Sequence, residues 1–70
     1  MKMKLEDAMV YCLAMADRGL KPEAMARIIN EQRLHVRADG NPVTEKQIWA
    51  AIFRNPQIFV WEGGIIHLLM

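Results

Sequence analysis

The chain has 70 residues, of which 53% are hydrophobic and 24% are charged, and its formal net charge is +1. This length and balance predict one globular domain over residues 1–70 and argue against intrinsic disorder. The near-zero charge excludes a strong global field that would attract nucleic acid or anionic lipid, so any basic footprint must be local.

Residues 5–18 are predicted to form a first helix. Apolar side chains recur along it at helical spacing, at Leu5, Ala8, Met9, Cys12, Leu13 and Ala16. Glu6 and Asp7 fall in its first turn, where the helix macrodipole favours negative charge. We expect Gly19 to stop this helix in a left-handed conformation, with Leu20 folding back onto it.

A second helix is predicted from Pro22 to near Arg33, because proline suits the first helical position, where its missing N–H is not needed. Its apolar stripe consists of Met25, Ile28 and Ile29. The connection over residues 19–21 is so short that the two helices must pack at an angle, as in a helix-turn-helix corner.

The stretch from Leu34 to Val43 contains Asp39-Gly40-Asn41-Pro42, whose residue types favour turns. We expect an exposed loop here, the most flexible part of the chain. Within it, residues 34–36 could form a very short third strand.

A third helix is predicted from about Glu45 to Arg54. Thr44-Glu45-Lys46-Gln47 has the spacing of a capping box, and Asn55-Pro56 ends the helix. The side chains expected to point inward are those of Ile48, Ala51 and Ile52.

Two β-rich runs, Ile58–Trp61 and Ile65–Leu69, flank Gly63-Gly64, which can adopt the positive φ values of a tight hairpin turn. With these two glycines as the turn, the expected pairs are Trp61 with Ile66, Phe59 with Leu68, and Val60 with His67. The predicted fold class is therefore α+β, a winged helix with three helices followed by a C-terminal two-stranded hairpin.

The order of elements and several short motifs resemble the HARE-type helix-turn-helix family over nearly the whole chain. The motifs are Gly19-Leu20-Lys21-Pro22, Ile28-Ile29, Arg33-Leu34, Gly40-Asn41-Pro42, Ile48, Ala51-Ile52, Phe59 and Gly63-Gly64. The amino-terminal domain of the bacterial RNA polymerase delta subunit is similar to this family, as are segments of restriction enzymes and chromatin regulators. The resemblance implies a winged helix whose role is contact with DNA.

The chain departs from the pattern of that family in three ways. Arg33 stands where members often have glycine, and the spacing between Pro42 and Ile48 is longer than usual. In the wing strand, where relatives tend to carry a basic residue, this chain has Trp61. Trp61 at this position argues against a DNA-reading role for the hairpin.

Our leading hypothesis is a bacterial, cytoplasmic winged-helix module that binds DNA or takes part in transcription regulation and has no catalytic activity. The candidate DNA contacts are Lys21, Arg33, Arg37, Lys46, Gln47 and Arg54. Phosphate contacts need positive charge, and base edges need hydrogen-bonding side chains.

The alternative is a protein-interaction module that forms a homodimer. Two aromatic residues, Trp49 and Phe53, fall on the outer or flanking surface of the third helix, although either could instead complete the core beneath the hairpin. The hairpin side opposite the core is also apolar. The candidate interface residues are Trp49, Phe53, Ile58, Val60, Ile65 and Leu69.

The sequence offers little for catalysis, metal binding or membrane insertion. Cys12 lies in an apolar stripe, where we expect a buried, inert thiol, and a single cysteine favours the reducing cytoplasm. We expect His35 in solvent and His67 on a strand face, with no metal and no cofactor.

No apolar run approaches the roughly 20 residues that span a bilayer. The basic and then apolar N-terminus superficially resembles a signal peptide, but Glu6 and Asp7 interrupt it.

Overall fold

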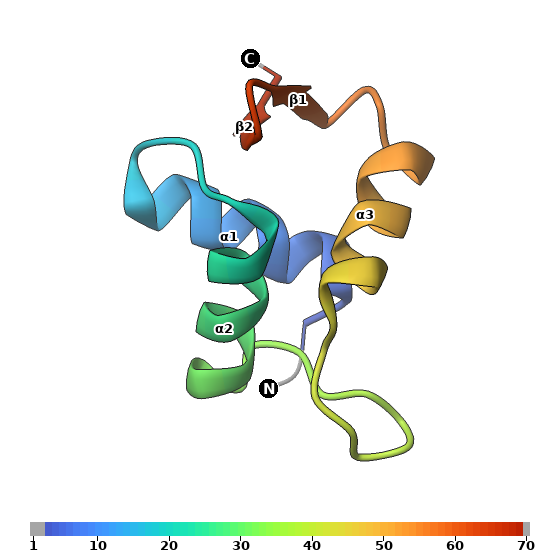
Figure 1. Cartoon of the computed structure of the whole chain (residues 1–70). Coiled ribbons are helices and arrows are strands. Elements are labelled where there is room, and N and C mark those ends of the chain that lie inside the picture. The colour runs from blue at the N-terminus through green and yellow to red at the C-terminus, as the bar shows by residue number, and fades with distance from the viewer. Residues whose placement is uncertain (1–2, 70) are drawn as a thin grey trace.

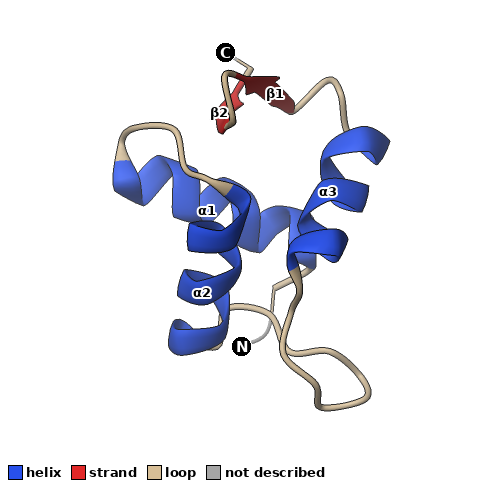
Figure 2. Cartoon of the chain, viewed as in Figure 1, coloured by secondary structure: helices blue, strands red, loops and turns tan. Residues whose placement is uncertain are grey.

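The computed structural model describes residues 3–69. The elements in chain order are α1 (Leu5–Ala16), α2 (Pro22–Gln32), α3 (Glu45–Arg54), β1 (Phe59–Glu62) and β2 (Ile65–Leu68). The three helices form one body, with the hairpin at one end and the loop between α2 and α3 at the other (Figure 1). The predicted α+β class and its order of three helices before a C-terminal hairpin are confirmed, and the layout is winged-helix-like (Figure 2).

The helices bury most of the predicted faces, although Ala16 and Ile28 are only half-buried and Ala26, which was not predicted, is buried. The core consists of Leu5, Ala8, Met9, Cys12, Leu13, Leu20, Met25, Ala26, Ile29, Val43, Ile48, Ala51, Ile52, Phe59 and Ile66. In α3 the three buried residues are the three expected to point inward. Helical periodicity was sufficient in α3 because its apolar stripe packs against the core, whereas α1 also carries the exposed apolar residues Tyr11 and Met15.

The hairpin has the predicted register. Phe59 pairs with Leu68, Val60 with His67, and Trp61 with Ile66. Gly63 and Gly64 have φ values of 60° and 82°, as the tight turn requires. The face with Trp61, Ile66, Phe59 and Leu68 was expected to be the core side of the hairpin, and this is correct for Phe59 and Ile66, which are buried. Leu68 is half-buried and Trp61 is 41% exposed.

The end of α1 differs from the prediction. The helix ends at Ala16, and Asp17, not Gly19, adopts the left-handed conformation, with φ of 54° and its N–H donating to the carbonyl of Leu13. Gly19 has another role, because a Cβ atom there would overlap Ile65 and His67 of β2. The glycine therefore permits close approach of the hairpin to the connection between α1 and α2.

The possible short third strand at residues 34–36 does not form. The hairpin instead pairs with Leu20, whose N–H donates to the carbonyl of Ile66 at 3.1 Å and whose carbonyl accepts from the N–H of Ile66 at 2.8 Å. Leu34 uses its backbone elsewhere: its N–H donates to the carbonyl of Ile29, and its carbonyl accepts from the N–H of Met3. These bonds occupy both backbone groups that Leu34 would need in a strand.

α2 ends in a Schellman motif. Arg33 adopts the left-handed conformation with φ of 53°, its N–H donates to the carbonyl of Asn30, and the Leu34 N–H reaches the carbonyl of Ile29. A left-handed residue at this position explains why glycine would be favoured there.

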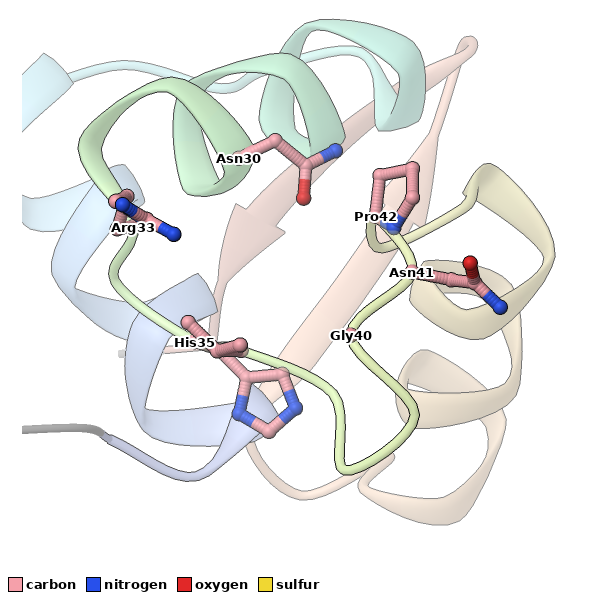
Figure 3. Close-up of a pocket in the computed structure, with 7 residues that line it drawn as sticks. Asn30, Arg33, His35, Gly40, Asn41 and Pro42 are labelled. Carbon is pink, nitrogen blue, oxygen red and sulfur yellow. The ribbon is translucent and has the colours of Figure 1, made fainter.

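The loop between α2 and α3 is attached to the helices more firmly than predicted. The side chain of Asn30 donates to the carbonyl of Val43 at 2.9 Å and accepts from its N–H at 2.8 Å. Val43 is buried, so the expectation of a loop exposed throughout is wrong at this end. Figure 3 shows Asn30 on α2 facing the returning segment at Pro42.

His35 is half-buried, not in solvent as predicted. Its Nδ1–H donates to the carbonyl of Met3 at 2.7 Å, while Leu34 accepts from the N–H of the same residue. The N-terminal segment therefore lies along the start of the loop, and this contact between distant parts of the chain left no local pattern in the sequence.

Candidate functional site

The outer face of α3 has two neighbouring rows of side chains. Burial of Ile48, Ala51 and Ile52 fixes the orientation of the helix and turns the opposite face outward. Residues four apart lie one above the other on a helix, so Lys46, Ala50 and Arg54 form one row, and all three are exposed. The adjacent row consists of Glu45, Trp49 and Phe53.

Three aromatic rings meet beside the basic row. Phe53 and Trp49 are stacked, with ring centroids 5.8 Å apart and planes at 22°, and Trp61 of β1 meets Trp49 edge-on at 4.2 Å. Phe53 is 73% exposed and Trp61 is 41% exposed, whereas Trp49 is half-buried and packs against the core. We call Phe53, Trp49 and Trp61 the aromatic cluster.

The cluster differs from the sequence expectation in two ways. The possibility that Phe53 completes the core is excluded by its exposure, while Trp49 is the ring that is partly inside. Trp61 was not recognised as a candidate site residue. The hairpin register indicates its exposure, because Trp61 shares a hairpin face with Phe59 but lies nearer the turn, beyond the edge of the core.

The candidate DNA contacts do not all lie together. Lys46 and Arg54 share the outer face of α3, whereas Lys21 precedes the first residue of α2 and Arg33 follows its last. All four of these side chains belong to exposed residues.

The other two candidates, Arg37 and Gln47, form structural bonds. The Arg37 guanidinium forms an ion pair with Asp39 at 2.6 Å and donates to Gln47 Oε1 at 3.4 Å. Gln47 Oε1 also accepts from the Thr44 N–H and completes the predicted capping box. The hydrogen bond from the Asn41 backbone N–H and the positive charge of Arg37 lower the pKa of Asp39.

The outer side of the hairpin is less open than predicted. Ile58 packs against the core, and Ile65 lies over Gly19. Ile58, Val60 and Ile65 are all half-buried, whereas Leu69, after the end of β2, is 53% exposed. The chain itself therefore covers much of the surface that a second molecule was expected to cover.

The groups with catalytic or metal-binding chemistry are dispersed. Cys12 is buried as predicted, and burial raises the pKa of its thiol to about 11, so the reactive thiolate is disfavoured at neutral pH. His67 is exposed on β2, as expected. Within residues 3–69, no group of three or more His, Cys, Asp or Glu side chains is placed to hold a metal ion. No helix in this described part is long and apolar enough to span a membrane.

Comparisons with known proteins give no match: no protein-family model, no curated protein and no solved structure matches this chain.

Proposed function

We propose that this chain is a non-catalytic winged-helix module that binds nucleic acid, in a DNA-associated or transcription-associated role, through the outer face of α3. The observation that carries the proposal is the placement of Lys46 and Arg54 on one exposed row of that helix. The ion pair found among residues 3–69 joins Arg37 to Asp39. Lys46 and Arg54 therefore remain available to contact phosphate oxygens. The sequence resemblance to the HARE-type family supports the same role.

The mode of binding that these residues favour is contact with the backbone of the nucleic acid. Base edges in a major groove are read by Arg, Lys, Asn or Gln, and Gln47 and Arg37 already bond within the protein. The outer face of α3 therefore offers only Lys46 and Arg54, two full turns apart, whose charges suit phosphates. Lys21 and Arg33 can add phosphate contacts beyond α3. Contacts by Lys46 and Arg54 alone correspond to a slope of the logarithm of affinity against the logarithm of salt concentration of about −1.8, and about four contacts that include both ends of α2 to a slope near −3.6.

The test is fluorescence anisotropy with labelled oligonucleotides over a series of salt concentrations. Replacing both cations, Lys46→Ala with Arg54→Ala, is expected to weaken binding and to make the salt slope shallower by about 2. The matched control is Arg18→Ala with Arg27→Ala, which removes the same charge from exposed positions on other elements. Absence of binding at low salt, or equal slopes for the two double variants, contradicts the proposal.

A second candidate function is protein interaction through self-association. The exposure of Phe53 favours it, because large apolar side chains at a surface commonly anchor interfaces. Sedimentation equilibrium of the isolated chain tests this candidate. A concentration-dependent dimer that Phe53→Ala converts to a monomer, with unchanged helical circular dichroism, would support it. A wild-type monomer at all concentrations would exclude it.

A further inference from the structure

We infer that the outer face of α3 binds single-stranded nucleic acid, with bases stacked on the aromatic cluster and phosphates on Lys46 and Arg54. This inference rests on the proposed nucleic-acid function and specifies its ligand. It depends on three features of the described residues: the parallel rows on α3, the arrangement of the rings, and the distribution of charge around them.

The two rows on α3 offer different chemistry side by side. Lys46 and Arg54 lie two helical turns apart, about 12 Å along the helix axis, with the small side chain of Ala50 between them. Trp49 and Phe53 occupy the neighbouring row. An extended single strand also has two sides, one of phosphates and one of bases, and it can lie along such a surface with both sides in contact.

The aromatic cluster provides a fixed stacking surface. Trp49 packs against the core and touches Trp61 edge-on, so its ring is held in place before any ligand binds. Phe53 lies nearly parallel to Trp49 and is the most exposed of the three rings. A base can stack on an exposed aromatic face whatever its identity, because every base has a π-face.

These aromatic rings suit a single strand better than a duplex. In a duplex the bases stack on one another and present only their edges in the grooves, where side-chain donors and acceptors read them. Phe53 has no such group, and each indole supplies only one donor. Unpaired bases expose the flat surfaces that these rings can contact.

Charge around the cluster favours an anion over a second copy of this chain. A two-fold dimer through this face would bring two copies of Lys46 and Arg54 into one interface, and like charges that come close across it weaken the contact. Glu45 begins the row of the rings one helical turn before Trp49, on the side away from Arg54, and Glu62 follows Trp61 on the opposite face of the hairpin. The row of Lys46, Ala50 and Arg54 is cationic, and Arg54 is the charged residue that follows Phe53 in α3.

Intrinsic fluorescence tests the inference directly, because both tryptophans of the chain, Trp49 and Trp61, belong to the cluster. The probes are a labelled oligothymidine, a mixed-sequence single strand and the duplex of that mixed sequence, at low and high salt. Single strands are expected to quench the tryptophan emission and to bind at least tenfold more tightly than the duplex.

The key variant is Phe53→Ala, which removes an exposed ring and leaves the buried face of α3 intact. Its single-strand affinity is expected to fall about 5- to 150-fold, the equivalent of one lost stacking contact. Tyr11→Ala is the matched control, since Tyr11 is an exposed aromatic residue on α1 outside the cluster. Circular dichroism of each variant verifies that it is folded.

The outcomes separate this inference from the function on which it rests. Equal or tighter binding of the duplex, or unchanged single-strand affinity of Phe53→Ala, overturns the single-strand inference while leaving nucleic-acid binding in place. Failure to bind any oligonucleotide at low salt overturns both. A dimer that Phe53→Ala dissociates and that binds no nucleic acid assigns the cluster to self-association instead.

Discussion

The two ends of the molecule are held to the helices by different forces. At the hairpin end, Phe59 and Ile66 are buried against the helices, and Gly19 lets the strands approach closely. At the loop end, Asn30 binds both polar groups of Val43, and His35 binds the carbonyl of Met3. The hairpin end also has the two backbone bonds between Leu20 and Ile66, and the loop end also buries Val43. The side chains at the hairpin end contribute mainly shape and volume, whereas Asn30 and His35 at the loop end contribute hydrogen bonds, and substitutions of the two kinds should separate them.

The largest effect is expected from Ile66→Ala at the hairpin end. Ile66 is fully buried, and removing its branched side chain leaves a cavity that should lower the free energy of unfolding by about 2–5 kcal/mol. Urea denaturation measures the loss. His67→Ala, at the next and exposed position of the same strand, is the control and should change stability by less than about 0.5 kcal/mol. Similar values for the two variants would mean that burial does not hold the hairpin.

Gly19→Ala should lower the free energy of unfolding by about 1–3 kcal/mol, because the added methyl group overlaps Ile65 and His67. The exposed His67 ring can swing away, but the β-branched Ile65 is stiff at χ1. A double-mutant cycle with Ile65→Ala therefore gives the sharper test: the second substitution should recover part of the loss. Strict additivity of the two changes would contradict the close approach.

At the loop end, Asn30→Ala should lower the free energy of unfolding by about 1–2 kcal/mol, because it removes two hydrogen bonds to Val43. Asn30→Asp keeps the acceptor for the Val43 N–H but loses the donor, so it should fall between the wild type and Asn30→Ala. Chemical denaturation gives the ranking, with Glu31→Ala as an exposed control on the same helix. An Asn30→Asp variant that is no more stable than Asn30→Ala would show that repulsion between its carboxylate and the Val43 carbonyl cancels the retained bond.

The smallest effect is a gain. Arg33→Gly should raise the free energy of unfolding by about 0.5–1 kcal/mol, because glycine adopts the left-handed conformation without the steric cost that arginine incurs. Thermal unfolding measures the gain, and the same variant reports whether Arg33 contributes to the salt dependence of nucleic-acid binding. A loss of stability would show that the arginine side chain stabilises the loop end by more than the backbone relief.

The fold could be predicted where local chemistry and tertiary structure agree. The capping box at Thr44 determined the start of α3, and Gly63-Gly64 determined the register of the hairpin, because each signal lies next to the structure it specifies. The inward faces of the helices followed from periodicity for the same reason. These features include the side of α3 on which Lys46 and Arg54 lie.

What the sequence did not predict depends on contacts between distant segments. Asp17 and Arg33 adopt positive φ without being glycines, so residue type did not reveal them, while Gly19 serves a contact with β2 rather than a helix end. The pairing of Leu20 with Ile66 and the meeting of Trp49 with Trp61 likewise join segments far apart in the chain. The aromatic cluster could be identified only from the tertiary structure, in which the hairpin packs against the helices.

The two hydrogen bonds between Leu20 and Ile66 also allow the docking of the hairpin on the helices to be measured. Each residue donates its N–H to the other, so both amide protons are protected as long as the hairpin stays on the helices. Their hydrogen-exchange rates under native conditions would report how often the hairpin lifts away, independently of whether the helices unfold. A ligand that contacts Trp61 should slow the exchange of these two amide protons. Their exchange rates would therefore report whether a ligand is bound at the aromatic cluster, although both amides lie at the other edge of the sheet.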